Sequence, residues 1–430
     1  MIGGSILLLM TGIPVAFAFM VVSVIGGFLF WGGEAGIRQF VLSMFSCLSS
    51  FTLLAIPMFT LMGEILFHSG IAIKTCDAIG KCMGRLPGKL ALVAVVLGTI
   101  LAALSGSGLA TSAILGTLLL PEMKKRGYKK PMILGPILGS AGLAIMIPPS
   151  SMSILIGSIG GISIGELLIG GTVPGLIMAF FYAIYIIVRC RLDPSLAPPF
   201  DVIATSFSEK VAIVVRYVLP VGIVIFSVMG LILLGIAGPS EAAATGVFAS
   251  LLLVALYNYR ELNWELARKS LMGTLSVTGM IFLIVAGSSA FSQMLGFSGA
   301  AASLVRAVVN KGVSPIIVVI LMQCVLLFLG CFIHVASIVM ITLPIFMPIV
   351  KALNINEVWF GLLMLLNMEM AGMTPPFGSY LFVVKAVSPP DRTMADVYNS
   401  GLPFLGMNLL VMILMLAFPG IVLWLPSLMR

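Results

Sequence analysis

Long stretches of the chain carry no charged residue. They include Met1–Gly33, Pro131–Gly165, Ser270–Val305 and Gly312–Val350. A helix needs roughly 20 residues to cross about 30 Å of hydrocarbon, and these stretches exceed that length. Several are too long for one crossing, which favours helical hairpins or broken helices over single rods. The pattern therefore predicts an all-α polytopic membrane protein.

The composition supports the same class. Of 430 residues, 60% are hydrophobic and 9% are charged, and a soluble protein of this length could not bury so much apolar surface. Soluble, secreted and nucleic-acid-binding proteins are thereby excluded. The net charge of +8 comes from basic residues in short connections, of which Lys124–Lys130 is the densest, as the positive-inside rule expects. The six cysteines show no ligand spacing, so we expect packing roles and no transition-metal site.

Landmarks of the first half recur later in the chain at a nearly constant offset. Pro121 corresponds to Pro348 at an offset of 227 residues, and Pro148-Pro149 corresponds to Pro375-Pro376 at the same offset. Other matches fall within two residues of that offset. Self-similarity at a fixed offset indicates an internal repeat. We predict two similar halves, at residues 1–192 and 211–430, with a connecting loop at 193–210.

The basic connections indicate that the two halves have opposite orientations. Lys124–Lys130 precedes the broken segment of the first half, whereas its counterpart Lys351–Glu357 holds one basic residue. In the second half, Lys385 and Arg392 follow the broken segment instead. Because basic residues favour one side of the membrane, we predict inverted repeats. Three crossings supply the odd number that inversion requires, at Val211–Ala237, Ala242–Asn258 and Leu271–Leu295.

Each half contains a predicted re-entrant helical hairpin followed by a broken transmembrane helix. The hairpins are 88–122, with the tip SGSG (Ser105–Gly108), and 313–349, with the tip GCFIH (Gly330–His334). The broken helices are 131–160, interrupted at IPPSS, and 357–388, interrupted at MTPPFGS. Paired prolines unwind a helix because they lack N–H groups and clash with the preceding turn. Backbone carbonyls freed inside a membrane must be satisfied by protein, water or an ion.

We predict that each hairpin tip and the neighbouring break form a sodium site, because hard cations prefer oxygen ligands. The positive N-terminal ends of the half-helices would face an anionic substrate. Candidates for the first site are Ser105, Gly106, Ser107, Gly108, Thr111, Gly142, Ile147 and Pro148. Candidates for the second site are Gly330, Ile333, His334, Ser337, Gly372, Thr374 and Pro375. Residues expected near the substrate are Ser150, Ser151, Glu369, Phe377, Gly378 and Ser379. The alternative without a ligand is a packing kink at each proline pair and a close helix contact at SGSG.

Three ionisable residues in apolar surroundings have more than one interpretation. Glu369 lies five residues before Thr374 and is expected to face the broken site. Glu64 lies four residues before His68, the pairing distance on one helix face, and a structural role near an interface is favoured. His334 could sense protons or could hydrogen-bond the hairpin tip.

Two longer segments resemble a known family. SGSGLATSAILGTLLLPEMKKRGY and PPSSMSILIGSIGGISIGELLIGGTVPGL are similar to the large membrane subunit of TRAP (tripartite ATP-independent periplasmic) transporters of bacteria and archaea. GIPVAFAF and TPPFGSYLFV match that family too, so the resemblance covers nearly the whole chain. The family belongs to the wider ion-transporter superfamily, which has inverted repeats and an elevator mechanism.

The resemblance implies a sodium-driven importer of small organic anions in the inner, or cytoplasmic, membrane. Its implied partners are a periplasmic substrate-binding protein, called the P subunit, and a small four-helix membrane subunit, called the Q subunit. The family's sodium sites correspond to Ser105–Gly108 with Gly142–Pro148, and to Gly330–His334 with Gly372–Pro375. The sequence departs from the family at His334, where an acid is frequent, and at Glu369, where many relatives are apolar or amide.

An elevator mechanism divides the chain into a moving block and a scaffold. We expect the block at about 88–165 and 313–390, and the scaffold in the other helices, with amphipathic arms near Ile37–Leu48 and Ile71–Cys82. The first alternative is a single-chain sodium/anion symporter of the same superfamily. A second is an intramembrane enzyme using His68 or His334, but no nucleophile, base or metal pattern surrounds either histidine, so a non-enzymatic transporter is favoured.

Overall fold

The computed structural model is built from helices. It describes residues 8, 13, 15–30, 33–82, 86–198, 207–297, 299, 303, 305–306, 312–389 and 391–429, and all regular structure within these ranges is helical. Among them, seven helices are long and apolar enough to span a membrane, or eight if one pair bent by 42° counts as a single span. Part of the predicted connecting loop, at 199–206, lies outside the described residues.

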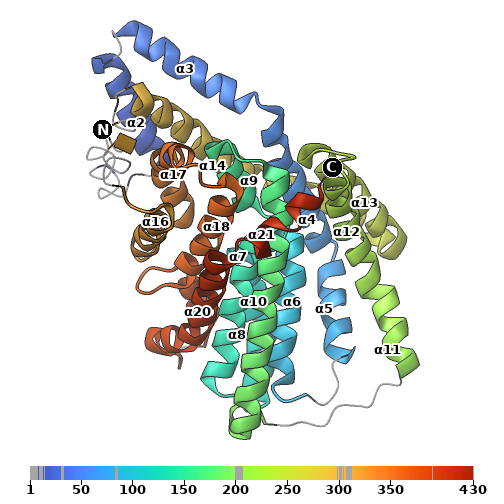
Figure 1. The fold of residues 1–430 in the computed structure, drawn as a ribbon. Coiled ribbons are helices and arrows are strands. Elements are labelled where there is room, and N and C mark those ends of the chain that lie inside the picture. The colour runs from blue at the N-terminus through green and yellow to red at the C-terminus, as the bar shows by residue number, and fades with distance from the viewer. Residues whose placement is uncertain are drawn as a thin grey trace.

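The first half begins with the helices at 15–82 and continues with the predicted hairpin and broken helix (Figure 1). Its helices are α2 (Val15–Phe30), α3 (Glu34–Leu48), η1 (Phe51–Leu54), α4 (Ala55–His68), α5 (Ile71–Cys82), α6 (Lys89–Ser105), α7 (Gly108–Lys125), α8 (Lys130–Met146), α9 (Ser151–Gly160) and α10 (Ile164–Leu192). Helices α3 and α5 lie where the amphipathic arms are predicted, and α6 with α7 lies where the first hairpin is predicted.

The second half repeats this order after a short 3-10 turn, η2 (Pro194–Leu196). Its first helices are α11 (Phe207–Ile213), the π turn η3 (Val214–Val218), α12 (Leu219–Leu233), α13 (Pro239–Tyr257), η4 (Tyr259–Glu261) and α14 (Trp264–Phe297). The following ones are α16 (Pro315–Gly330), α17 (Val335–Ala352), α18 (Glu357–Met373), α19 (Ser379–Ala386), α20 (Met394–Ala417), α21 (Gly420–Leu423) and η5 (Pro426–Leu428). Helices α12, α13 and α14 occupy the three predicted intervening crossings.

The second arm of each hairpin is longer than predicted. Helix α7 runs to Lys125 with Pro121 inside it, and α17 runs to Ala352 with Pro348 inside it. A proline removes one helical N–H donor but need not end a helix whose neighbours satisfy the freed carbonyl. At 18 residues each, these arms reach about 27 Å at 1.5 Å per residue.

The two broken helices occupy the centre of the molecule. Every residue from Met132 to Met146 in α8 is buried, and so is every residue from Val358 to Met373 in α18. A helix that is apolar on all sides belongs in a core rather than at a surface. Helix α8 packs against α6, α7, α10, α18 and α20, and α18 packs against α16, α17 and α20.

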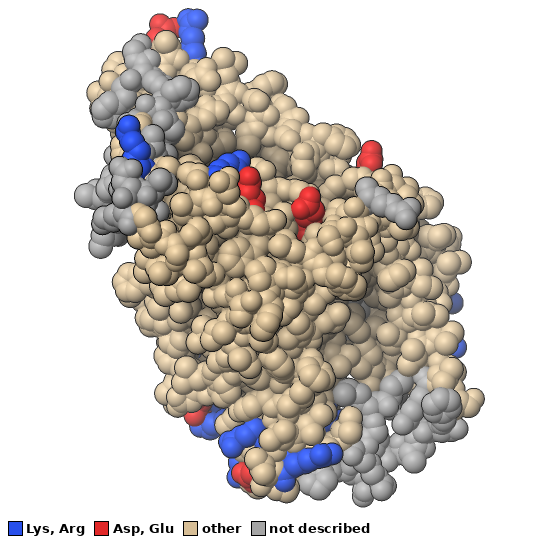
Figure 2. Space-filling view, in the orientation of Figure 1, with Lys and Arg blue, Asp and Glu red and all other residues tan. Residues whose placement is uncertain are grey.

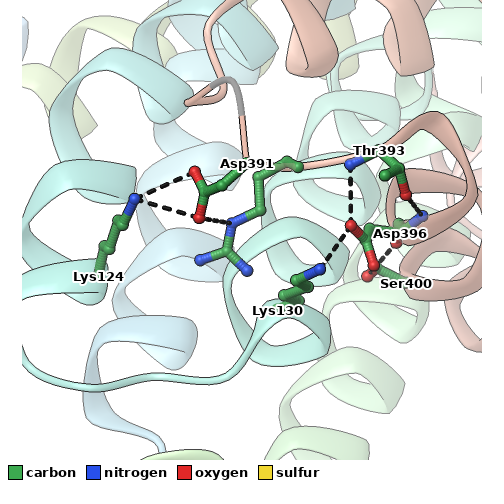
Figure 3. A network of polar contacts seen from close by, with 7 residues as sticks. Lys124, Lys130, Asp391, Thr393, Asp396 and Ser400 are labelled. Atoms are coloured by element: carbon green, nitrogen blue, oxygen red, sulfur yellow. Dashed lines mark hydrogen bonds and ion pairs between the residues drawn. The ribbon is translucent and has the colours of Figure 1, made fainter.

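Ion pairs between the halves show that the repeats run in opposite directions. Lys124 Nζ lies 3.1 Å from Asp391 Oδ1, and Lys130 Nζ lies 2.7 Å from Asp396 Oδ2 (Figure 3). The connection before the first broken helix therefore lies beside the connection after the second broken helix. Parallel repeats would instead place the two connections that precede the broken helices on one side, so the inverted arrangement predicted from basic residues is confirmed.

Charged side chains are sparse over the middle of the molecule. On the face seen in Figure 2, most Lys, Arg, Asp and Glu residues lie toward the upper and lower ends, with a broad uncharged surface between them. Large apolar residues such as Phe226 of α12 and Phe248 and Leu256 of α13 are exposed. Exposed apolar surface between two charged ends fits a chain whose middle faces hydrocarbon.

Candidate functional site

The first break separates α8 from α9 at Ile147–Ser150. Ile147 is extended, with ψ 122°, so α8 ends at Met146. Ser150 is buried and caps α9, because its hydroxyl accepts a 3.3 Å hydrogen bond from the Ser153 N–H. The peptide bond between Pro148 and Pro149 is cis. The half-helix α9 therefore begins with a satisfied cap directly after the prolines.

The tip of the first hairpin contacts this break directly. Ser151 Oγ donates a 3.0 Å hydrogen bond to the Gly106 carbonyl. Gly106 has φ +58°, and a Cβ there would lie 3.0 Å from the Pro149 carbonyl oxygen, so a larger residue would be strained and crowded. The Ser107 hydroxyl caps α7 by accepting from the Ala110 N–H at 3.4 Å. The structure thus brings together the tip and break of the first predicted ion site.

Three other candidates of the first site have different surroundings. Thr111 is fully buried one turn into α7, and its N–H donates to the Ser107 carbonyl at 3.0 Å. Ser105 ends α6, and its side chain lies outside the described part of the chain. Gly142 lies a turn before the break and packs against the Glu369 carboxylate of the other half. Gly142 therefore lies at the interface between α8 and α18.

The second hairpin tip is closed by a histidine cap. His334 Nδ1 accepts a 3.4 Å hydrogen bond from the Ala336 N–H, and the His334 carbonyl accepts from the Ser337 N–H at 2.9 Å. Of the two interpretations of His334, hydrogen bonding at the tip is the one that this geometry supports. Ile333 continues the turn by donating its N–H to the Leu329 carbonyl at 2.9 Å. The side chain of Ser337 is buried in the first turn of α17.

Hydrogen bonds made by Thr374 and Gly378 fix the backbone of the second break. Thr374 Oγ1 donates to the Met370 carbonyl at 2.7 Å, and the Gly378 N–H donates to the Thr374 carbonyl at 3.0 Å. A Cβ at Gly378 would lie 2.7 Å from the Gly372 carbonyl oxygen, so only glycine permits this close turn. The Pro375–Pro376 peptide bond is cis, as in the first half.

Contacts from other helices reach this second site. A Cβ at Gly330 would lie 2.5 Å from Ala371 Cβ, so the tip of α16 sits closely on the last turn of α18. Tyr398 of α20 donates its hydroxyl to the Pro376 carbonyl at 3.0 Å. Ser379 starts α19, and Phe377 beside it is 59% exposed. The structure therefore places the start of the second tip against the last turn of α18, just before the second break.

Glu369 is buried in a polar network that the sequence did not reveal. Its side chain is fully buried, and Oε2 accepts a 2.6 Å hydrogen bond from Asn408 Nδ2 of α20. Asn408 Oδ1 in turn accepts from the Tyr182 hydroxyl of α10 at 2.5 Å. The network, with Gly142, joins four helices, α8, α10, α18 and α20. The signal available in the sequence was a lone Asn408 within an apolar run.

Glu64 and His68 form a pair at a helix interface. His68 Nε2 lies 3.1 Å from Glu64 Oε2 on α4. A Cβ at Gly273 of α14 would lie 2.6 Å from the Glu64 carboxyl carbon, which places the pair against that helix. This arrangement fits the structural role favoured for Glu64.

Comparison with known proteins places the chain in one family. Residues 2–421 match the family described as "Tripartite ATP-independent periplasmic transporter, DctM component". The C4-dicarboxylate TRAP transporter large permease protein DctM of Pseudomonas aeruginosa is 32% identical over 391 residues, covering 91% of this chain and 90% of that protein. The ectoine TRAP transporter large permease protein TeaC of Halomonas elongata is 30% identical over 429 residues, covering 100% of this chain and 98% of that protein.

A solved structure shares the fold. The Alcanivorax borkumensis YdaH transporter superposes with a TM-score of 0.60 at 13% identity, over 90% of this chain and 89% of that one. At such low identity the likeness concerns the fold alone. The family match over nearly the whole length and the seven or more apolar helices describe a multi-pass inner-membrane protein. The chain belongs to the family of TRAP transporter large permease components.

Proposed function

We propose that this permease takes up a small organic anion, a carboxylate or a sulfonate, coupled to sodium and by an elevator mechanism. A large permease of a tripartite system works with a binding protein and a small membrane subunit, and its relatives are permeases rather than enzymes. The relatives are named for C4-dicarboxylate and for ectoine, so family membership alone leaves the substrate open. The anion and its delivery by a periplasmic P subunit are part of the proposal.

The observation that carries the proposal is the hydrogen bond between the first tip and the first break. The Ser151 hydroxyl of α9 donates a hydrogen bond to the Gly106 carbonyl at 3.0 Å, so two segments 45 residues apart in the sequence place hydroxyl and carbonyl oxygens side by side. Hydroxyl and carbonyl oxygens are suitable ligands for a hard cation without adding a fixed charge. A site of this kind can be neutral when empty and gain charge when sodium binds.

The half-helices favour an anion next to such a site. Helices α9 and α19 both begin at the breaks, and neither has an acidic residue in its first turn. The N-terminal end of a helix carries a partial positive charge and free N–H groups, which attract carboxylate or sulfonate groups. Sodium binding at the tips would add to this attraction, and that provides the coupling between ion and substrate.

The packing of the helices supports an extension of the proposed moving block. Helices α10 and α20 pack directly against α8, so we add them to the block proposed from the sequence at 88–165 and 313–390. Helices α2, α4, α12, α13 and α14 pack on one another in pairs and form the proposed scaffold. The arm α3 connects α2 to α4 along the chain and packs against α2 and α14, whereas the arm α5 follows α4 and also contacts α6 of the block (Figure 1).

Reconstitution tests the proposal. The chain, its small membrane subunit and the binding protein are placed in proteoliposomes, and uptake is screened across dicarboxylates, keto acids, sialic acids and sulfonates. We expect uptake only with an inward sodium gradient, and none with potassium at equal ionic strength. Uptake by the chain alone, driven by protons without sodium, would refute the proposal. Sodium-driven uptake without the binding protein would instead establish the single-chain symporter.

A further inference from the structure

Tyr380 lies where elements of the two halves meet. It is the second residue of α19 and is 3% exposed. Its ring contacts Gly108, at the tip of the first hairpin, and Gly372, in the last turn of α18. A Cβ at Gly108 would lie 2.6 Å from Tyr380 Cζ, and one at Gly372 would lie 2.5 Å from Tyr380 Cε2. Both positions therefore require glycine to accommodate this one ring.

The two glycines belong to different proposed ion sites. Gly108 is a residue of the first site, and Gly372 is a residue of the second. The contact continues beyond the tip, because a Cβ at Gly116 of α7 would also collide with the side chain of Val387, just after α19. Helix α19 is thus fitted against the first hairpin along about two turns. A displacement of the first tip cannot leave α19 and the end of α18 unaffected, because closely packed elements transmit strain.

We propose that Tyr380 couples the two sodium sites, so that an ion at one improves binding at the other. The inference rests on the proposed sodium-coupled function. Sodium at the first site orders the tip around Gly108, the ordered tip holds the Tyr380 ring, and the ring holds Gly372 where the second ion binds. The second ion then binds a site that is already ordered, so its binding loses less conformational entropy. This is positive cooperativity. Tyr380 acts here as a positioning residue and does not itself bind sodium.

A purely structural role makes a different prediction, and the chain offers a matched control. Phe404 of α20 is fully buried and also rests on two glycines, Gly135 and Gly139 of α8. These glycines lie in the middle of a helix, away from both tips and both breaks. Truncating either aromatic ring leaves a cavity and lowers stability, but only truncation of Tyr380 is expected to change how the two ions influence each other.

Sodium titration of the purified full-length chain tests the coupling. Sodium binding is measured at constant temperature by the saturable change in intrinsic fluorescence as sodium chloride replaces potassium chloride at constant ionic strength. The thermal unfolding midpoint is recorded in parallel, since a bound ion stabilises the folded state. We expect the wild-type protein to respond with a Hill coefficient above 1. Tyr380→Leu should bring the coefficient to about 1 and raise the sodium concentration for half effect about 5-fold or more, the usual size of such coupling. Tyr380→Phe removes the hydroxyl, the atom nearest to a Cβ at Gly108, but keeps the ring carbons that touch both glycines. It should therefore retain a Hill coefficient above 1.

The remaining outcomes separate this inference from the proposed function. Phe404→Leu should lower the midpoint at every sodium concentration with an unchanged Hill coefficient. If Tyr380→Leu does not fold, Tyr380→Met fills the space with a flexible chain and should show the same loss of cooperativity. A wild-type coefficient of 1, or equal loss in both truncations, would overturn the inference while sodium binding stands. No sodium response in the wild type would overturn the proposed sodium coupling itself.

Discussion

Replacing Gly142 with alanine introduces a methyl group where the Glu369 carboxylate now lies. The methyl would overlap the carboxylate oxygen Oε1, and both residues lie in the buried stretches of α8 and α18. The carboxylate cannot move away freely, because its other oxygen accepts the 2.6 Å hydrogen bond from Asn408. The strain is therefore shared between helix packing and this hydrogen bond.

The change in the free energy of unfolding is the sum of two destabilising effects and one stabilising effect. Overpacking a tight core costs about 1–3 kcal/mol, and weakening an ordinary buried hydrogen bond costs about 0.5–1.5 kcal/mol. Alanine in place of glycine inside a helix returns about 1 kcal/mol. We expect Gly142→Ala to destabilise the protein by about 0.5–3.5 kcal/mol, mainly through contacts between the two halves.

Thermal unfolding of the purified variants measures this effect at one scan rate. Gly279→Ala is the control, because Gly279 lies within α14 with nothing within 4 Å of its would-be Cβ, and its midpoint should be unchanged or raised. In a Glu369→Ala background, Gly142→Ala should lose most of its cost, because the group it meets is gone. A wild-type midpoint for Gly142→Ala, or the same cost in both backgrounds, would refute the reasoning.

Three further predictions concern the first site and the connections. Ser151→Ala removes the 3.0 Å hydrogen bond to Gly106, which is worth about 1 kcal/mol. The apparent sodium affinity of uptake should therefore fall about 5-fold, whereas Ser151→Thr should leave it unchanged. Equal affinities in the wild type and Ser151→Ala would contradict the role of this contact. Pro148→Ala should weaken sodium coupling while leaving membrane insertion intact, and unchanged sodium dependence of uptake would count against a functional break. Hydrogen bonds from Lys124 hold the pKa of Asp391 below its ordinary value. The pair therefore stabilises the folded protein at pH values above the ordinary pKa of aspartate, and this stabilisation is lost as pH falls through the lowered pKa. The difference in unfolding midpoint between the wild type and Asp391→Asn should vanish in acid, and a difference that grows in acid would contradict this sign.

The features that the sequence predicted well are those with local causes. Proline pairs disrupt helices by their own chemistry, so the breaks after Met146 and Met373 could be placed without a structure. Glycine and serine marked the first hairpin tip, Ser105–Gly108, because both residues favour turns. The basic connections indicated the inversion, which the pairing of Lys124 with Asp391 confirms.

The features that the sequence could not supply depend on packing between distant segments. Nothing near Gly142 in the chain shows that Glu369 of the other half is its neighbour. The packing of the Tyr380 ring between Gly108 and Gly372 likewise becomes apparent only in the folded structure, where the two halves meet. Prolines also mislead at helix ends, because Pro121 is tolerated inside α7 where a termination was expected. Local chemistry predicts where a helix breaks, whereas contacts across the interface decide what the break touches.

Hydrogen exchange of the purified chain tests the central claim most directly, namely that sodium orders the tips against the breaks. Exchange is compared in sodium and in potassium chloride at equal ionic strength, since protection reports local opening. We predict that sodium slows exchange around Gly106 and Ser151 and around His334 and Thr374, with no change in the scaffold helices α12 and α13. Unchanged exchange at both tips, or equal slowing throughout the scaffold, would contradict the account.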